Sequence, residues 1–230
     1  MAPDMGTFEA FYASPTQHPF LLWAAAGAAL IYCATRTNLD ATVRRYCFAL
    51  VVLSGLDAWM SSAHIYGIGA LEGMAASVVP LFFVLAGDTR FLIVAVAGSP
   101  GGKLEINGRV AALAAGLTVL VPVTTQVILR SLPESMNHAR MMFFIYEVLF
   151  VLLTLTLLRV HENVRTNPWV QRVAHFVVIY YGLWATADLI ILTTGADIGF
   201  AVRVLPNVLY YGGLIAVMAW SAEKASEESH

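Results

Sequence analysis

Charged and polar side chains recur at helical spacing within long apolar stretches of the sequence. In the second stretch, Ser54, Asp57, Ser61 and His64 follow one another at intervals that place all four on one face of a helix. An ionisable side chain inside a membrane is costly and usually faces the interior of a helix bundle. The stripe therefore predicts a ligand or proton site. The alternative is a structural role, in which the serine hydroxyls bond to backbone carbonyls of their own helix.

Later stretches add further candidates, which are ionisable or aromatic and share helix faces: Glu147, Trp184, Asp188, Arg203, Asn207 and Tyr210. Arg203 cannot lose its proton, so it needs a carboxylate, an anionic ligand or the membrane interface as its partner. We expect Glu147 or Asp188 to join it in a cluster, which could serve a site or a purely structural ion pair. Pro206 lies in the same stretch and removes one backbone donor there.

The third stretch contains two secondary candidates, Asp88 and Arg90, within the segment Gly87-Asp88-Thr89-Arg90. Residues two apart do not share a helix face well, so we expect them to have different partners or to mark a helix end. Two interpretations of the stretch remain open. Either the helix continues to Ala97, or it stops near Gly87 and the following apolar residues lie along the membrane interface.

The composition indicates that a membrane surrounds these residues. Of 230 residues, 59% are hydrophobic and 12% are charged, and the mean hydropathy is +0.72. Soluble domains carry about 25% charged residues, and a helical span needs about 20 apolar ones. We predict an all-α, polytopic membrane protein with seven transmembrane helices at about 19–35, 46–66, 72–97, 108–130, 139–160, 170–193 and 200–221.

The distribution of lysine and arginine predicts the orientation. Positive residues gather in the loops at 36–45, 98–109 and 160–172, and positive residues in short loops mark the cytoplasmic side. We therefore expect an N-out, C-in chain in the cell membrane, as an inner-membrane protein. Its parts would be an extracytoplasmic segment 1–18, a seven-helix domain 19–221 and a charged, disordered cytoplasmic tail 222–230. The first 18 residues contain no lysine or arginine, so the first span should be an uncleaved anchor.

We compared the sequence with three families of membrane proteins. In each comparison, the sequence lacks a residue that the family requires. Microbial rhodopsins carry a lysine in the last helix for the retinal Schiff base, whereas the lysines here are Lys103 and Lys224, outside the predicted spans. Zinc-dependent seven-helix lipid hydrolases need a histidine pair that the last stretch lacks. Asp57-Ala58-Trp59 is faintly similar to small terpene cyclases, but Met60 replaces the acid expected after the tryptophan.

No cofactor or metal is expected, because neither the two cysteines nor the histidines show the spacing of a metal or haem site. The net charge of −2 argues against binding to nucleic acid. The expected partners are membrane lipid and, in addition, a small-molecule ligand, a second copy of the chain or another membrane subunit.

Three functions remain open. The first is transport of a small polar or protonated solute, with Asp57 as the proton or ion site. The second is an intramembrane enzyme that acts by acid catalysis on a lipid or isoprenoid, as terpene cyclases do. The third is a sensor or an assembly subunit, whose polar stripes would face a partner protein instead of converging on one cavity.

Overall fold

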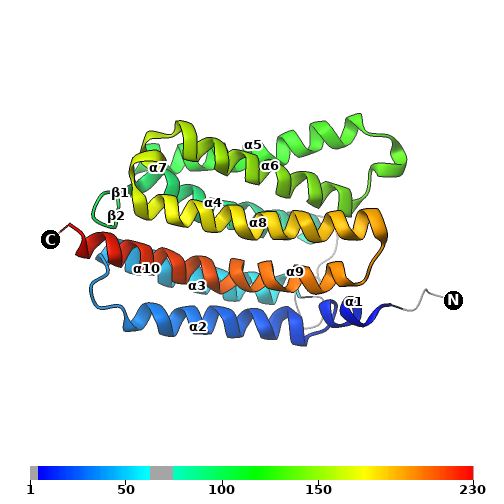
Figure 1. Ribbon diagram of the computed structural model, residues 1–230, viewed down its shortest axis with the longest axis horizontal. Coiled ribbons are helices and arrows are strands. Elements are labelled where there is room, and N and C mark those ends of the chain that lie inside the picture. The colour runs from blue at the N-terminus through cyan, green and yellow to red at the C-terminus, as the bar shows by residue number, and fades with distance from the viewer. Residues whose placement is uncertain (1–4, 63–74, 230) are drawn as a thin grey trace.

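The computed structural model describes residues 5–62 and 75–229, and these form an elongated bundle of helices (Figure 1). In the described part of the chain, seven long helical segments run along the bundle: η1–α2 (Thr16–Thr35), α3 (Ala41–Met60), α4 (Ala75–Ala97), α5 (Gly108–Ser131), α6 (Ala139–Val160), α8 (Pro168–Thr194) and α9–η4–α10 (Ile198–Glu227). Short elements join them: α1 (Thr7–Tyr12), the hairpin β1 (Gly98–Ser99) and β2 (Lys103–Leu104), η3 (Glu134–Met136) and α7 (Glu162–Thr166).

The predicted spans correspond to the long segments, with differences at their ends. Helix α4 continues through Asp88 and Arg90 to Ala97, which decides between the two interpretations of that stretch. Helix α3 begins at Ala41, capped by the Asp40 carboxylate, and ends at Met60, so it lies several residues earlier than predicted. Helix α10 continues to Glu227, so most of the predicted disordered tail is helical.

The composition of the helices supports the membrane assignment. By length and apolar character, five of the described segments could cross a membrane: those at 16–35, 108–131, 139–160, 168–194 and 198–227. Helix α3 carries three charged residues (Arg44, Arg45 and Asp57) and packs with α4 inside the same bundle. The prediction of an all-α, multi-pass membrane protein is confirmed. Which end faces the cytoplasm stays a prediction.

The two halves of the bundle are packed differently. Towards the C-terminal end of α10, large apolar side chains such as Phe91, Trp169 and Met218 are completely buried. The β1–β2 hairpin closes this end, because Asn167 and Trp169 donate hydrogen bonds to the carbonyls of Gly98 and Ser99 at 3.1 and 2.9 Å. At the other end, near α1, the packing opens into a cavity.

The last helical segment is interrupted where it borders this cavity. It contains Pro206 and then a π-helical turn, η4 (Leu209–Gly213), before α10 (Leu214–Glu227) continues. Gly212 in this turn lies so close to α2 that an added Cβ would be 2.4 Å from the Ala25 carbonyl oxygen. A π-helical turn inside an α-helix is frequently found at a functional site, which draws attention to the side chains around it.

Candidate functional site

A cavity of about 1030 Å³ lies inside the open half of the bundle, with walls from every long helical segment. It reaches from Tyr12 in α1 and His138 before α6 down to Tyr211 in η4. Eight of the predicted site residues line it: Asp57, Ser61, Asp88, Glu147, Trp184, Arg203, Asn207 and Tyr210. Two more, Asp188 and Arg90, lie behind its wall and contact lining residues. His64 lies outside the described residues.

A cluster of four charged side chains, the upper cluster, lies at the end of the cavity near α1. Arg203 forms ion pairs with Asp188 and, at 3.7 Å, with Glu147, so both of its predicted partners are present. Asp188 is completely buried and also accepts a hydrogen bond from Arg140 at 3.0 Å. Arg203 donates a further hydrogen bond to the Tyr12 hydroxyl at 3.2 Å. The guanidinium group is therefore held inside the bundle by neighbours from α1, α6 and α8.

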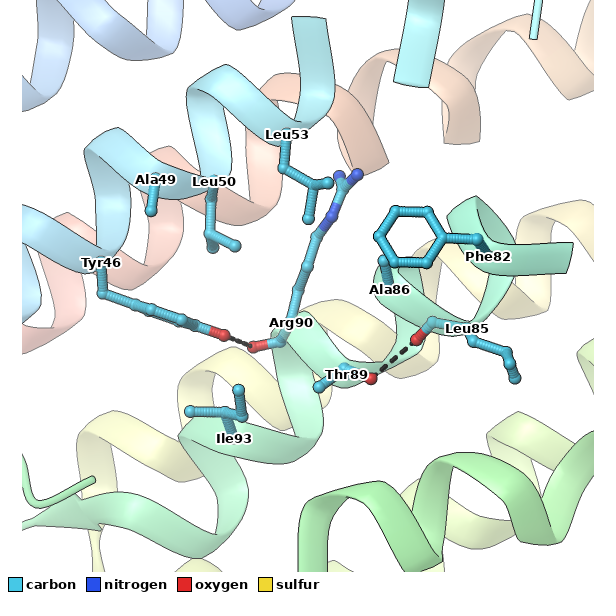
Figure 2. Close-up of a pocket in the computed structure, with 10 residues that line it drawn as sticks. All are labelled: Tyr46, Ala49, Leu50, Leu53, Phe82, Leu85, Ala86, Thr89, Arg90 and Ile93. Carbon is cyan, nitrogen blue, oxygen red and sulfur yellow. Dashed lines mark hydrogen bonds between the residues drawn. The ribbon is translucent and has the colours of Figure 1, made fainter. Parts of the chain in front are cut away.

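A second ion pair lies deeper, between α3 and α4. Arg90 is 1% exposed, and its guanidinium donates to Asp57 at 3.3 Å and to Ser54 at 3.0 Å. It also lies 4.6 Å from the centre of the Tyr210 ring. Figure 2 shows Arg90 extending from α4 towards α3 beside Leu53. Asp57 is in the last turn of α3, and the ion pair ties that turn to the middle of α4.

A separate groove of about 410 Å³ lies between α3 and α4, beside Arg90 (Figure 2). Its lining is apolar apart from Tyr46, Thr89 and Arg90 itself. The Tyr46 hydroxyl donates a 2.8 Å hydrogen bond to the Arg90 carbonyl, as the dashed line in Figure 2 marks. Arg90 thus lines this groove and also contacts Asp57 in the wall of the main cavity.

Asp88 occupies the middle of the cavity wall and has a different kind of partner. It is 2% exposed, and its two carboxylate oxygens accept hydrogen bonds from the hydroxyls of Tyr146 and Tyr181. Among the described residues, none places a positively charged nitrogen within 4.0 Å of this carboxylate. Asp88 and Arg90 therefore have different partners, as their spacing predicted.

Aromatic rings form much of the remaining wall. The Trp184 ring lies 5.3 Å from both Tyr181 and Tyr210, and Tyr210 lies 5.0 Å from Tyr211. The Trp184 indole nitrogen donates to the Asn207 side-chain oxygen at 2.8 Å, which fixes the orientation of both groups. Ser61 directly follows the last residue of α3, and its hydroxyl lies 3.1 Å from the His18 ring.

Several lining residues were not among the predicted ones: Tyr12, His18, Arg140, Tyr146, Tyr181 and Tyr211. A signal existed for Tyr181, because residues 181, 184 and 188 share a helix face. Arg140 is placed at a predicted span end, where arginine is expected to face the interface. Tyr12 and His18 precede the first span, so no helical periodicity connects them to the bundle interior.

The cavity lacks a lysine among the described residues. Lys103 lies in β2 and Lys224 lies in α10 beside Glu228, both in the closed half. In the last helical segment, the side chains that face the cavity are Arg203, Asn207, Tyr210 and Tyr211. A chromophore held through a lysine Schiff base therefore does not fit this site.

Comparison with known proteins addresses the fold. No protein-family model and no curated protein matched the sequence. Among solved structures, the chain is similar to one described as "Crystallographic Structure of Xanthorhodopsin, a Light-Driven Ion Pump with Dual Chromophore". The TM-score is 0.53 at 16% sequence identity, over 94% of this chain and 97% of that one. At such low identity the likeness concerns the arrangement of the helices, and the chain shares the fold of that rhodopsin.

Proposed function

We propose that this protein transports protons across the membrane, alone or together with a small polar solute, through the cavity inside the bundle. The observation that carries the proposal is the convergence of ionisable side chains from four helical segments on one cavity: Asp57 from α3, Asp88 from α4, Glu147 from α6 and Arg203 from α9. An assembly subunit would be expected to turn such stripes outward, towards its partner.

The charged groups form three sets around the cavity. These are the Arg203 cluster near α1, Asp88 with its two tyrosines, and the Asp57–Arg90 ion pair. Chains of buried carboxylates and hydroxyls are typical of proton relays in pumps and transporters. A carboxylate can accept and release a proton in each set, whereas the arginines keep their charge and hold the carboxylates in place.

The arrangement also implies a conformational change. Below the Asp57–Arg90 pair, the closed half contains completely buried apolar side chains such as Phe91, Val173 and Ile215. A solute that enters near α1 can therefore cross the membrane only after these apolar side chains have moved apart. The π-helical turn η4 and Pro206 interrupt the last helical segment beside the cavity. Rigid halves that move about such broken helices are a common feature of transporters.

Proton flux into proteoliposomes would test the proposal. Vesicles loaded with a pH-sensitive dye are given a membrane voltage by a potassium gradient and valinomycin. We expect flux above that of empty vesicles, and at least a tenfold loss in Glu147→Gln. Glu105→Gln carries the same chemical change at an exposed position outside the cavity and should retain the flux. Wild-type flux equal to that of empty vesicles, at both signs of voltage, would overturn the proposal.

A further inference from the structure

Among the described residues around the cavity, Asp88 is a buried carboxylate that forms no ion pair within 4.0 Å. In the upper cluster, two arginines (Arg140 and Arg203) face two carboxylates (Asp188 and Glu147). Deeper in the bundle, Arg90 binds Asp57 and gives its other hydrogen bond to Ser54. Asp88 remains as a carboxylate of the cavity wall whose hydrogen bonds come from neutral hydroxyls.

The two tyrosine hydroxyls satisfy the oxygens of Asp88 without neutralising its charge. A buried charge is expensive unless an opposite charge compensates it. Two hydroxyl donors suit an ionised carboxyl group, whose oxygens are acceptors only. Since Asp88 lines the cavity, a ligand could bring the missing positive charge to it.

The surroundings of Asp88 suit an organic cation better than a metal ion. Within the described residues, no group of three or more metal-ligating side chains could hold a metal ion. The rings of Tyr181, Trp184 and Tyr210 instead form a continuous aromatic wall, with centroids 5.3 Å apart on each side of the tryptophan. Aromatic faces attract ammonium groups, and such rings recognise quaternary ammonium ligands in other proteins.

A second acceptor is available in the same cavity. Glu147 is only 5% exposed, and one of its carboxylate oxygens, Oε2, has no hydrogen-bond partner in the described part of the chain. Glu147 lines the cavity together with Asp88. A ligand with a positive group at Asp88 and a hydrogen-bond donor elsewhere could satisfy both. The cavity of about 1030 Å³ is at the upper end of the range for small-molecule sites, roughly 300–1,000 Å³.

We infer that the cavity binds an organic cation, a protonated amine or a quaternary ammonium compound, with its positive group against Asp88 and the aromatic wall of Tyr181, Trp184 and Tyr210. The inference rests on the proposed function, in which this cation is the solute that moves with or against protons. The binding needs no covalent bond to the protein.

Calorimetric titration of the protein in lipid nanodiscs would test this with three ligands that share one ring and differ in charge. The cation is benzyltrimethylammonium, the neutral compound is benzyl alcohol, and the anion is phenylacetate. We expect the cation to bind at least tenfold more tightly than the other two. Asp88→Asn should abolish that preference, Asp88→Glu should retain it, and Glu105→Gln should leave it unchanged.

The tyrosines give a second, independent variant. Tyr181→Phe keeps the ring but removes one hydroxyl from Asp88. The carboxylate then depends more on the ligand, so the cation should bind as tightly as before or more tightly. Thermal unfolding of each variant confirms that it is folded. The inference is overturned if folded wild-type protein does not prefer the cation, or if folded Asp88→Asn keeps the preference.

The two proposals fail separately. Cation binding without proton flux would keep the site at Asp88 and remove the transport function. Proton flux that depends on Glu147, with no preference for the cation, would keep transport and overturn the organic cation as the solute.

Discussion

The buried pair of Asp57 and Arg90 allows a quantitative test of the structure. Asp57→Asn removes the negative charge at nearly constant shape, and Arg90→Met removes the positive charge while it keeps a long side chain. The two groups are 3.3 Å apart, and their side chains are 7% and 1% exposed. The double variant removes both charges, so the four proteins form a double-mutant cycle.

The expected magnitudes follow from burial. Removing one partner of a buried ion pair costs about 3–5 kcal/mol, because the other charge is left uncompensated. For a chain of this size, 1 kcal/mol corresponds to about 2–4 °C in Tm, so Asp57→Asn should lower Tm by about 6–20 °C. Arg90→Met should cost less, since the carboxyl of Asp57 can take up a proton whereas an arginine cannot lose one. The double variant should recover part of the loss.

Thermal unfolding in one detergent, followed by tryptophan fluorescence, measures all four proteins. A coupling energy of at least about 1 kcal/mol supports the ion pair, since pairs in contact typically couple by 0.5–3 kcal/mol. Strictly additive losses would refute the reasoning, because they would mean that the two charges do not depend on each other. A smaller loss in Asp57→Asn than in Arg90→Met would refute the argument from proton uptake.

Two further predictions concern packing and capping. Gly212→Ala should lower the free energy of unfolding by about 1–3 kcal/mol, because the added Cβ would lie 2.4 Å from the backbone oxygen of Ala25. Gly182→Ala is the control and should be neutral or stabilising, because its added Cβ meets nothing within 4 Å. Equal effects of the two substitutions would contradict the close contact of α2 with η4. Asp197→Ala should destabilise α1, because the Asp197 carboxylate accepts hydrogen bonds from the backbone N–H groups of Phe8 and Glu9 at 2.8 Å each. The rate of amide hydrogen exchange at residues 7–12 should therefore rise. Unchanged protection of these amides would contradict the role of Asp197 as a cap.

Much of the fold follows from the sequence because the membrane imposes a simple rule. Each span needs a long apolar stretch, and all the long segments are found near their predicted positions. The exceptions occur where polar residues decide the end of a helix. Asp40 caps α3 at its start, which a plot of hydropathy alone does not reveal. Helix α4 is not an exception, because it runs to Ala97 as one of the two interpretations of its sequence expected, and Asp88 and Arg90 each find partners inside the bundle.

The sequence singles out several of the residues that line the cavity, but it does not reveal their pairings. Helical spacing singles out Asp57, Glu147, Asp188 and Arg203, because an ionisable residue in an apolar stretch is conspicuous. It does not reveal that Arg90 binds Asp57, since the two are 33 residues apart on different helices. The spacing also does not show that Asp88 meets two tyrosines from α6 and α8. Such pairings depend on how the helices rotate and pack.

The likeness to a rhodopsin and the chemistry of the cavity are separate facts. Helix packing depends on close contacts such as Gly212 against Ala25, and these are compatible with many different side chains inside the bundle. The function depends on a few buried groups, and here the last helical segment presents Asn207 and Tyr211 to the cavity without a lysine. A shared fold therefore does not transfer the activity of its neighbour. In the proposal made above, Asp88, which has no ion-pair partner among the described residues, and the aromatic wall beside it are the features by which this cavity would select its own ligand.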